Sequence, residues 1–394
     1  MQTTNNALKL LALSTVATLL LACGGASNMT EETEGQTGPE AEVEVDLVAL
    51  KIMLGRDLFN DTALSEPAGQ SCASCHKASA GFADSDSTHL TPVSEGAITG
   101  QFGNRNAPSA AYASLIPDFR YDSSTQEYSD GQFLDGRAAN LTTQAQGPFL
   151  NPVEMANVDE HMLAEKLRLA PYADNFVLVY GQATLDDELL AFDAIADAIA
   201  AFESSSELNP FSSKFDAYLA GQAVLSTEES LGLDLFEGRA LCTECHPIAN
   251  EGPVLFSDFL YSNIGAPKNP NNPIYDSDPD FIDIGLAGND RAGRNIANER
   301  GLFRTPTLRN VALTAPYLHN GSLATLEDVV HFYNTRDSRS CDFVTDGIAF
   351  ENCWPVPEVE TTMDIARMGD MLLTEDDEAN LVAFLKVLSD GFFQ

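Results

Sequence analysis

The stretch SCASCH, residues 71–76, returns as LCTECH at residues 241–246. Each copy holds two cysteines separated by two residues, with a histidine directly after the second cysteine. A zinc ribbon needs two such pairs about 15–20 residues apart, much closer than these two, and a thioredoxin-type redox pair does not need the histidine. Covalent attachment of c-type haem needs all three residues, because the thiols form thioethers with the haem vinyl groups and the histidine binds the iron.

The two motifs therefore predict two covalently bound c-type haems, each with a proximal histidine ligand. Export of the chain, indicated by its N-terminal sequence, agrees with this prediction because c-type haem is attached outside the cytoplasm. The residues predicted to hold the two haems are Cys72, Cys75, His76, Cys242, Cys245 and His246.

The sequence around the motifs repeats as well. LGRDLF at 54–59 and LGLDLF at 231–236 share the pattern L-G-x-D-L-F, which indicates an internal duplication. Between the copies, residues 186–203 place apolar side chains near a 3.6-residue period, which predicts a helix. Strand-like alternation is scarce. We therefore predict a mainly α fold with two cytochrome c-like domains, at residues 47–205 and 206–394.

The N-terminus has the features of a secretory signal. Lys9 precedes the apolar run LLALSTVATLLLA, which is shorter than the ~20 residues that span a bilayer. The run ends in LLAC, residues 20–23, which resembles the lipobox of bacterial lipoproteins and implies a lipid on Cys23. An ordinary cleaved signal peptide is the alternative. We expect a signal peptide at 1–22 and a lipidated acidic tether at 23–46, and Gly24 favours the outer membrane.

The charge and the remaining cysteines add two expectations. With 59 Asp and Glu against 21 Lys and Arg, the net charge of −38 excludes nucleic acid as a partner. Cys341 and Cys353 are left after the other cysteines have been assigned. In an exported protein they predict a disulfide that closes a surface loop.

Several further segments, from about residue 50 to the C-terminus, resemble the bacterial di-haem cytochrome c peroxidase family, which includes the MauG-like enzymes. These segments are RNAP at 105–108, DGR at 135–137, GPFLNPVEM at 147–155, FRTPTLRNVALTAPYLHNGSLATLEDVV at 303–330 and LTEDDEANLVAFLK at 373–386.

The resemblance implies that the first haem reacts with peroxide and that the second passes electrons. It places three residues on the distal side of the first haem, with the carboxylate moving the proton needed to cleave the O–O bond. It also implies one calcium ion between the haems, bound by an asparagine and two backbone carbonyls. The distal residues are Gln144, Pro148 and Glu154, and the calcium ligands are Asn106, Thr314 and Pro316.

The chain departs from the family pattern at both irons. Ile98 stands where typical members have a histidine that caps the resting first haem, so we expect that iron to be open. His89 could replace it but is interpreted as a surface residue. Tyr333 stands where typical members have a methionine ligand of the second haem, and tyrosine is what the MauG-like branch uses. The alternative ligands are Met363, Met368 and Met371.

A third departure concerns the region between the haems. Leu134 replaces the usual tryptophan, so an oxidisable relay at that position is missing, and Trp354 is the only tryptophan in the chain.

Three functions remain open from the sequence. We favour an exported enzyme that uses hydrogen peroxide and oxidises a protein partner. The first alternative is a peroxidase that scavenges peroxide with electrons from a small cytochrome or cupredoxin. The second is a di-haem electron carrier without peroxide chemistry, which the loss of the relay at residue 134 would permit.

Overall fold

The fold is described by a computed structural model for residues 46–249, 252–292, 296–339 and 353–392. Within these ranges the chain is mainly helical, which confirms the predicted fold class. The α-helices are α1 (Leu47–Asn60), α2 (Cys72–Cys75), α3 (Leu141–Leu150), α4 (Glu160–Leu169), α5 (Ala173–Tyr180), α6 (Gln182–Asp186), α7 (Glu188–Glu203), α8 (Lys214–Leu219), α9 (Thr227–Glu237), α10 (Ile274–Ser277), α11 (Ile296–Glu299), α12 (Leu326–Thr335) and α13 (Glu375–Lys386).

The strands in the described ranges form two small antiparallel sheets. In the first, β1 (Arg120–Asp122) pairs with β2 (Glu127–Ser129), and in the second, β3 (Tyr261–Ser262) pairs with β4 (Phe303–Arg304). A bridge between Ser129 and Leu260 links the two sheets.

The predicted helix at 186–203 is present as α7. Asp187 caps it, because its carboxylate accepts hydrogen bonds from the backbone N–H groups of Leu189 and Leu190. Of the apolar positions that carried the prediction, Phe192, Ile195, Ile199 and Phe202 are buried. Leu189, which belongs to the same period, is 60 % exposed. Helical periodicity shows which residues share a face, but it does not show how much of that face other segments cover.

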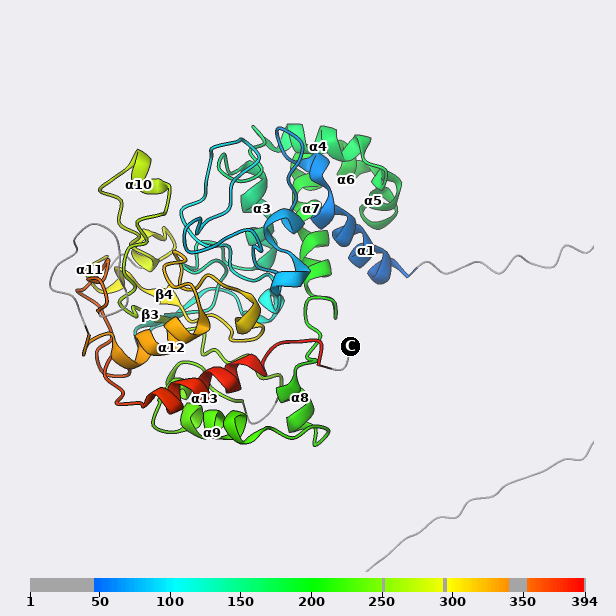
Figure 1. The fold of residues 1–394 in the computed structure, drawn as a ribbon. Coiled ribbons are helices and arrows are strands. Elements are labelled where there is room, and N and C mark those ends of the chain that lie inside the picture. Colours follow the sequence, from blue (N-terminus) through cyan, green and yellow to red (C-terminus); the bar gives the residue numbers. More distant parts are fainter. Residues whose placement is uncertain (1–45, 250–251, 293–295, 340–352, 393–394) are drawn as a thin grey trace, which may run out of the picture. The chain divides into compact units, whose positions relative to one another are not determined.

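Two hydrophobic clusters form the core of the unit that spans residues 45–394. The first contains buried residues between positions 54 and 208, and the second contains buried residues between positions 215 and 388. In the first cluster α1 packs against α7, and in the second α9 packs against α13 (Figure 1). The change from one cluster to the other lies between residues 208 and 215, a few residues beyond the boundary at 205/206, which stays a prediction.

The repeated L-G-x-D-L-F segment makes the same contact in both halves. A Cβ added to Gly55 of α1 would overlap the backbone carbonyl of Ala198 in α7, and one added to Gly232 of α9 would overlap that of Asn380 in α13. Each glycine therefore lets two helix backbones approach closely. Equal contacts at equal positions of the repeat are what an internal duplication predicts.

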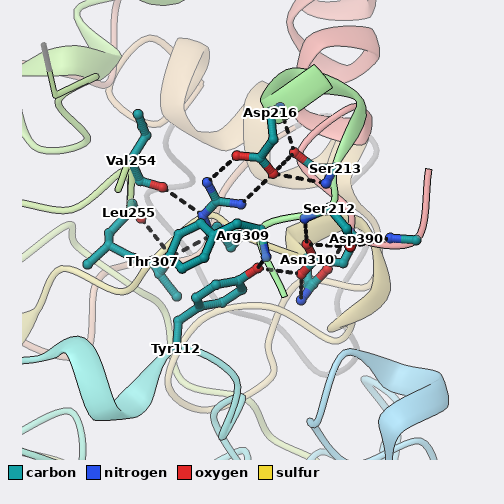
Figure 2. A network of polar contacts seen from close by, with 12 residues as sticks. Tyr112, Ser212, Ser213, Asp216, Val254, Leu255, Thr307, Arg309, Asn310 and Asp390 are labelled. Atoms are coloured by element: carbon teal, nitrogen blue, oxygen red, sulfur yellow. Dashed lines mark hydrogen bonds and ion pairs between the residues drawn. The ribbon is translucent and has the colours of Figure 1, made fainter. Parts of the chain in front are cut away.

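A buried polar network joins the segment around Tyr112 to the second half of the chain (Figure 2). The Tyr112 hydroxyl donates to Asp390 at 2.7 Å, and Asp390 also accepts from Asn310 at 2.9 Å. The guanidinium of Arg309 lies 5.0 Å from the Tyr112 ring and donates to both carboxylate oxygens of Asp216, at 2.7 and 2.9 Å. Because these groups satisfy one another, the network can remain buried between the two halves.

Some predictions about the chain ends and loops fall on residues that the structure does not describe. Cys23, with its predicted lipid, and Cys341 lie outside the described residues. Cys353 is disulfide-bonded, as predicted, while the residue predicted to be its partner is among those not described. Over the part of the chain that is described, no helix has the length and apolar composition needed to cross a bilayer.

Candidate active site

A cavity of about 320 Å³ lies at the second cysteine motif, where Cys242, Cys245 and His246 line it. Helix α12 contributes four more lining residues. They are Leu326, Val329, Val330 and Tyr333, the residues whose i, i+3, i+4, i+7 spacing predicted a shared helix face. His331 does not line the cavity; its Nδ1 lies 3.0 Å from Glu378. The sequence pattern thus placed Tyr333 and His331 on the correct sides of this helix.

Both motif histidines are held in the form that can bind a metal. The Nδ1 atom of His76 lies 3.0 Å from the carbonyl oxygen of Phe82, and that of His246 lies 2.7 Å from the carbonyl of Phe256. A carbonyl can only accept, so Nδ1 donates and Nε2 keeps its lone pair. Burial lowers the pKa of both rings, which favours the neutral imidazole that a metal requires.

None of the four motif cysteines forms a disulfide. Burial raises the pKa of Cys75 and Cys245 to about 11 and that of Cys242 to about 12, and it raises the pKa of Cys72 further. Reactive redox cysteines have depressed pKa values instead, because the thiolate is their nucleophile. The environment of these thiols therefore disfavours thioredoxin-type chemistry and is compatible with attachment of a cofactor.

The three residues predicted on the distal side of the first haem lie close together. Gln144 and Pro148 are one turn apart in α3, and Glu154 follows in a turn in which the Met155 backbone N–H donates to the Pro148 carbonyl at 3.1 Å. Burial raises the pKa of Glu154, an effect that Arg137 opposes. The charge of Glu154 also raises the pKa of Cys72 and Cys75, so this carboxyl is near the first motif.

The loop at 96–104, where the capping histidine is missing, is anchored next to Glu154. The backbone N–H of Ala97 donates to the Glu154 carbonyl at 2.7 Å. Ile98 is 42 % exposed, and His89 is exposed as expected of a surface histidine. Both side chains are therefore exposed, as expected if neither of them binds iron.

The predicted calcium ligands are partly brought together. The Asn106 side-chain amide donates to the Pro316 carbonyl at 2.9 Å, and Thr314 lines the same cavity. Exchanging the amide nitrogen and oxygen of Asn106, which a side-chain flip does, would place two oxygens face to face, as around a cation. In the described ranges no three His, Cys, Asp or Glu residues cluster around a metal site. A cation here would depend on amide and carbonyl oxygens.

Arg105 of the RNAP motif pairs with Asp135 of the DGR motif and with a second carboxylate, Asp283, that the sequence analysis did not single out. Arg105 forms ion pairs with Asp135 at 2.7 Å and with Asp283 at 2.6 Å. Burial raises the pKa of Asp283, but the hydrogen bonds and charge of Arg105 outweigh it and bring the pKa down to about 2. No local pattern marks Asp283, because its partner is far away in the sequence.

The cavity at the second cysteine motif is also lined by Leu134, which stands in place of the usual tryptophan. Its walls are largely apolar, its motif supplies two thiols and a neutral histidine, and α12 presents a phenol. These donors fit an iron porphyrin with two axial ligands.

Comparison with known proteins decides the family. The family model described as di-haem cytochrome c peroxidase matches residues 49–224. The methylamine utilization protein MauG of Paracoccus denitrificans is 37 % identical over 348 residues, which cover 86 % of this chain and 89 % of that protein. This chain belongs to the di-haem cytochrome c peroxidase and MauG family. It is therefore an oxidoreductase of the di-haem peroxidase type.

Other members of the family show the same relationship. Cytochrome c551 peroxidase of Nitrosomonas europaea is 36 % identical over 280 residues, which cover 70 % of each protein. The crystal structure of the diheme peroxidase BthA from Burkholderia thailandensis superposes with a TM-score of 0.76 at 32 % identity, covering 88 % of this chain and 89 % of that one. Membership implies two haems in this chain.

Proposed function

We propose that this chain is an exported di-haem enzyme that uses hydrogen peroxide at the first haem and oxidises a protein partner through the second, in MauG-like fashion. The observation that carries the proposal is Tyr333, which lies on the cavity face of α12 where typical members have methionine. The similarity to the MauG protein of Paracoccus denitrificans agrees with it.

We propose that Tyr333 and His246, which line the same cavity, would hold the iron of the second haem. Burial, with a smaller contribution from the sulfurs of Cys245 and Cys242, raises the pKa of the free phenol. Iron would therefore have to displace the phenolic proton. A phenolate ligand stabilises ferric iron and lowers the reduction potential, whereas a thioether raises it. Met368 and Met371 also line the cavity and are the competing ligands.

The first haem supplies an iron at which the O–O bond of peroxide can be cleaved, and the chain supplies the proton transfer. We assign Glu154 as the group that takes the peroxide proton and returns it to the leaving oxygen. Gln144 and Pro148 line the same distal side and shape it. The absence of a histidine in the loop at 96–104 leaves room for peroxide.

The remaining assignments complete the proposal. Both haems are bound covalently through the cysteine motifs, with His76 and His246 as proximal ligands, and one calcium ion is bound at Asn106, Thr314 and Pro316. Residues 47–205 carry the peroxidatic haem and residues 206–394 carry the electron-transfer haem.

A peroxide-scavenging peroxidase is the second candidate. The group of Gln144, Pro148 and Glu154 is compatible with it, and Nitrosomonas europaea supplies a relative named cytochrome c551 peroxidase. A scavenger must be refilled with electrons from a small donor through the second haem. A phenolate ligand and the non-oxidisable Leu134 both oppose rapid refilling. An electron carrier without peroxide chemistry is a third candidate, which the partly buried Glu154 does not favour.

Stopped-flow spectroscopy separates the first two candidates. After addition of peroxide we expect the oxidising equivalents to persist in the enzyme and to be lost only slowly to reduced cytochrome or cupredoxin. Leu134→Trp should speed oxidation of the small donor if the leucine limits transfer between the haems. Rapid steady turnover of a small donor by the natural enzyme would defeat the oxidase proposal and favour the scavenger.

We also propose that a lipid on Cys23 anchors the exported enzyme to the outer membrane. The motif at residues 20–23 supports this. Replacing Cys23 with serine should release the holoenzyme from the membrane fraction into the soluble fraction, measured by haem staining after fractionation. Unchanged membrane association of the variant would show that the anchor lies elsewhere.

A further inference from the structure

Three arginines line the cavity at the second cysteine motif: Arg304, Arg309 and Arg367. Arg309 forms an ion pair with Asp216 at 2.7 Å, and Arg367 forms one with Asp364 at 2.5 Å. Among the residues that the structure describes, Arg304 has no carboxylate within ion-pair distance. Arg304 is therefore the one arginine of this cavity without a carboxylate partner, although the chain has a large excess of acidic residues.

The local contacts of Arg304 use only part of its hydrogen-bonding capacity. The side chain donates to the carbonyl of Thr305 at 3.2 Å and to that of Phe133 at 3.3 Å, and its Nε has no partner. The ring of Phe259 lies 5.5 Å from the guanidinium. A guanidinium has five N–H donors, so most of them remain free.

The carboxylate whose charge acts on Arg304 is already engaged. The charge of Asp130 acts on Arg304, but the carboxylate of Asp130 accepts a hydrogen bond from Arg120 at 2.7 Å. Arg304 is only 6 % exposed, so bulk water does not solvate its charge. A buried charge without a counter-ion is destabilising. An anion inside the cavity would remove that cost.

We propose that Arg304 binds a propionate carboxylate of the second haem. The proposal rests on the proposed function only in placing a haem at Cys242, Cys245 and His246. A haem brings two carboxylates into this cavity, and the planar guanidinium fork matches a carboxylate in geometry and charge. The other two arginines of the cavity are already neutralised by protein carboxylates.

This assignment orients the second haem. The backbone N–H of Arg304 donates to the carbonyl of Leu134 at 2.8 Å, and its side chain reaches the neighbouring Phe133 carbonyl. The carboxylate edge of the haem would then lie beside the Phe133–Leu134 segment, which comes from the first half of the chain. Hydrogen bonds through Arg304 connect that edge to the backbone at the position of the missing relay.

Resonance Raman spectroscopy of the ferric holoenzyme tests the proposal without peroxide. The propionate bending bands report hydrogen bonds to each carboxylate, and those of the second haem are identified by their loss in a Cys242→Ala, Cys245→Ala chain. In Arg304→Met we expect one of these bands to shift and the potential of the second haem to fall, because a neighbouring positive charge is lost. Arg304→Lys should give a smaller shift. Arg367→Met, which removes a paired arginine from the same cavity, should leave the band unchanged.

Unchanged propionate bands in Arg304→Met with two haems bound would overturn the proposal. If Arg304→Met fails to retain the second haem, the propionate bending band of Arg304→Lys tests the proposal instead. A shifted band would support the proposal, and an unshifted band would overturn it. Acetate tests the alternative that Arg304 binds a free carboxylate ligand and not a haem propionate. An acetate-dependent change in the spectrum of the natural protein that is absent from Arg304→Met, with unshifted propionate bands, would also overturn it. None of these outcomes depends on which oxidase or peroxidase function holds.

Discussion

Replacing Glu154 with glutamine slows the reaction of the enzyme with hydrogen peroxide by about 10²–10⁴-fold, the usual contribution of a positioned acid–base group. Glutamine keeps the size and much of the polarity of the side chain but cannot take up and return a proton. The measurement is the second-order rate constant for peroxide in single-mixing stopped-flow experiments. Haem content and the resting spectrum should be unchanged, because Glu154 is not expected to bind iron.

A matched substitution controls for the loss of negative charge. Glu127 is an exposed residue at the start of strand β2, and Glu127→Gln should react with peroxide at the natural rate. A Glu154→Gln enzyme that also reacts at the natural rate would remove the carboxyl from the mechanism. Another group would then have to carry the proton.

The pH dependence gives a second readout of the same residue. Burial raises the pKa of Glu154 above the ordinary value of 4.5. The carboxylate is the form that accepts a proton, so the rate should decline as the pH falls through this raised pKa. The decline should therefore begin at a higher pH than for an exposed carboxylate. Glu154→Gln should lack this acidic limb, whereas Glu127→Gln should retain it.

Replacing Tyr333 with methionine raises the potential of the second haem by an amount on the order of tenths of a volt, since axial ligands set haem potentials over about 0.8 V. A neutral thioether stabilises ferrous iron, whereas a phenolate stabilises ferric iron. Spectroelectrochemical titration measures the change, and the first haem should keep its potential. Tyr333→Phe should alter the low-spin signal in electron paramagnetic resonance, because it removes the ligating oxygen.

The same variants distinguish Tyr333 from the two methionines that compete with it as the ligand. If Met368 or Met371 is the ligand, Tyr333→Phe leaves the low-spin signal and the potential unchanged. In that case Met368→Leu or Met371→Leu should produce the change instead. Such a result would remove the main support for the oxidase and favour the scavenging peroxidase.

Local sequence patterns were sufficient for much of this molecule. The cysteine motifs, the capping of α7 and the cavity face of α12 depend on residues within a few turns of one another. Tyr333 could be placed because helical geometry alone determines which residues share its face. The repeated glycines at 55 and 232 could be matched as a pattern, but the pattern did not reveal that each contacts a helix more than a hundred residues further along.

Other properties of the site were decided by tertiary structure. Asp283 binds Arg105 although the two residues are 178 positions apart in the sequence. Leu189 is exposed because the segments that pack against α7 do not cover this residue. Arg304 looks in the sequence like any basic residue of a strand. Its role follows from its burial in a cavity, where Asp130, the carboxylate whose charge acts on it, is already paired with Arg120. Burial and charge compensation depend on segments that fold together from distant parts of the chain, so no local pattern encodes them.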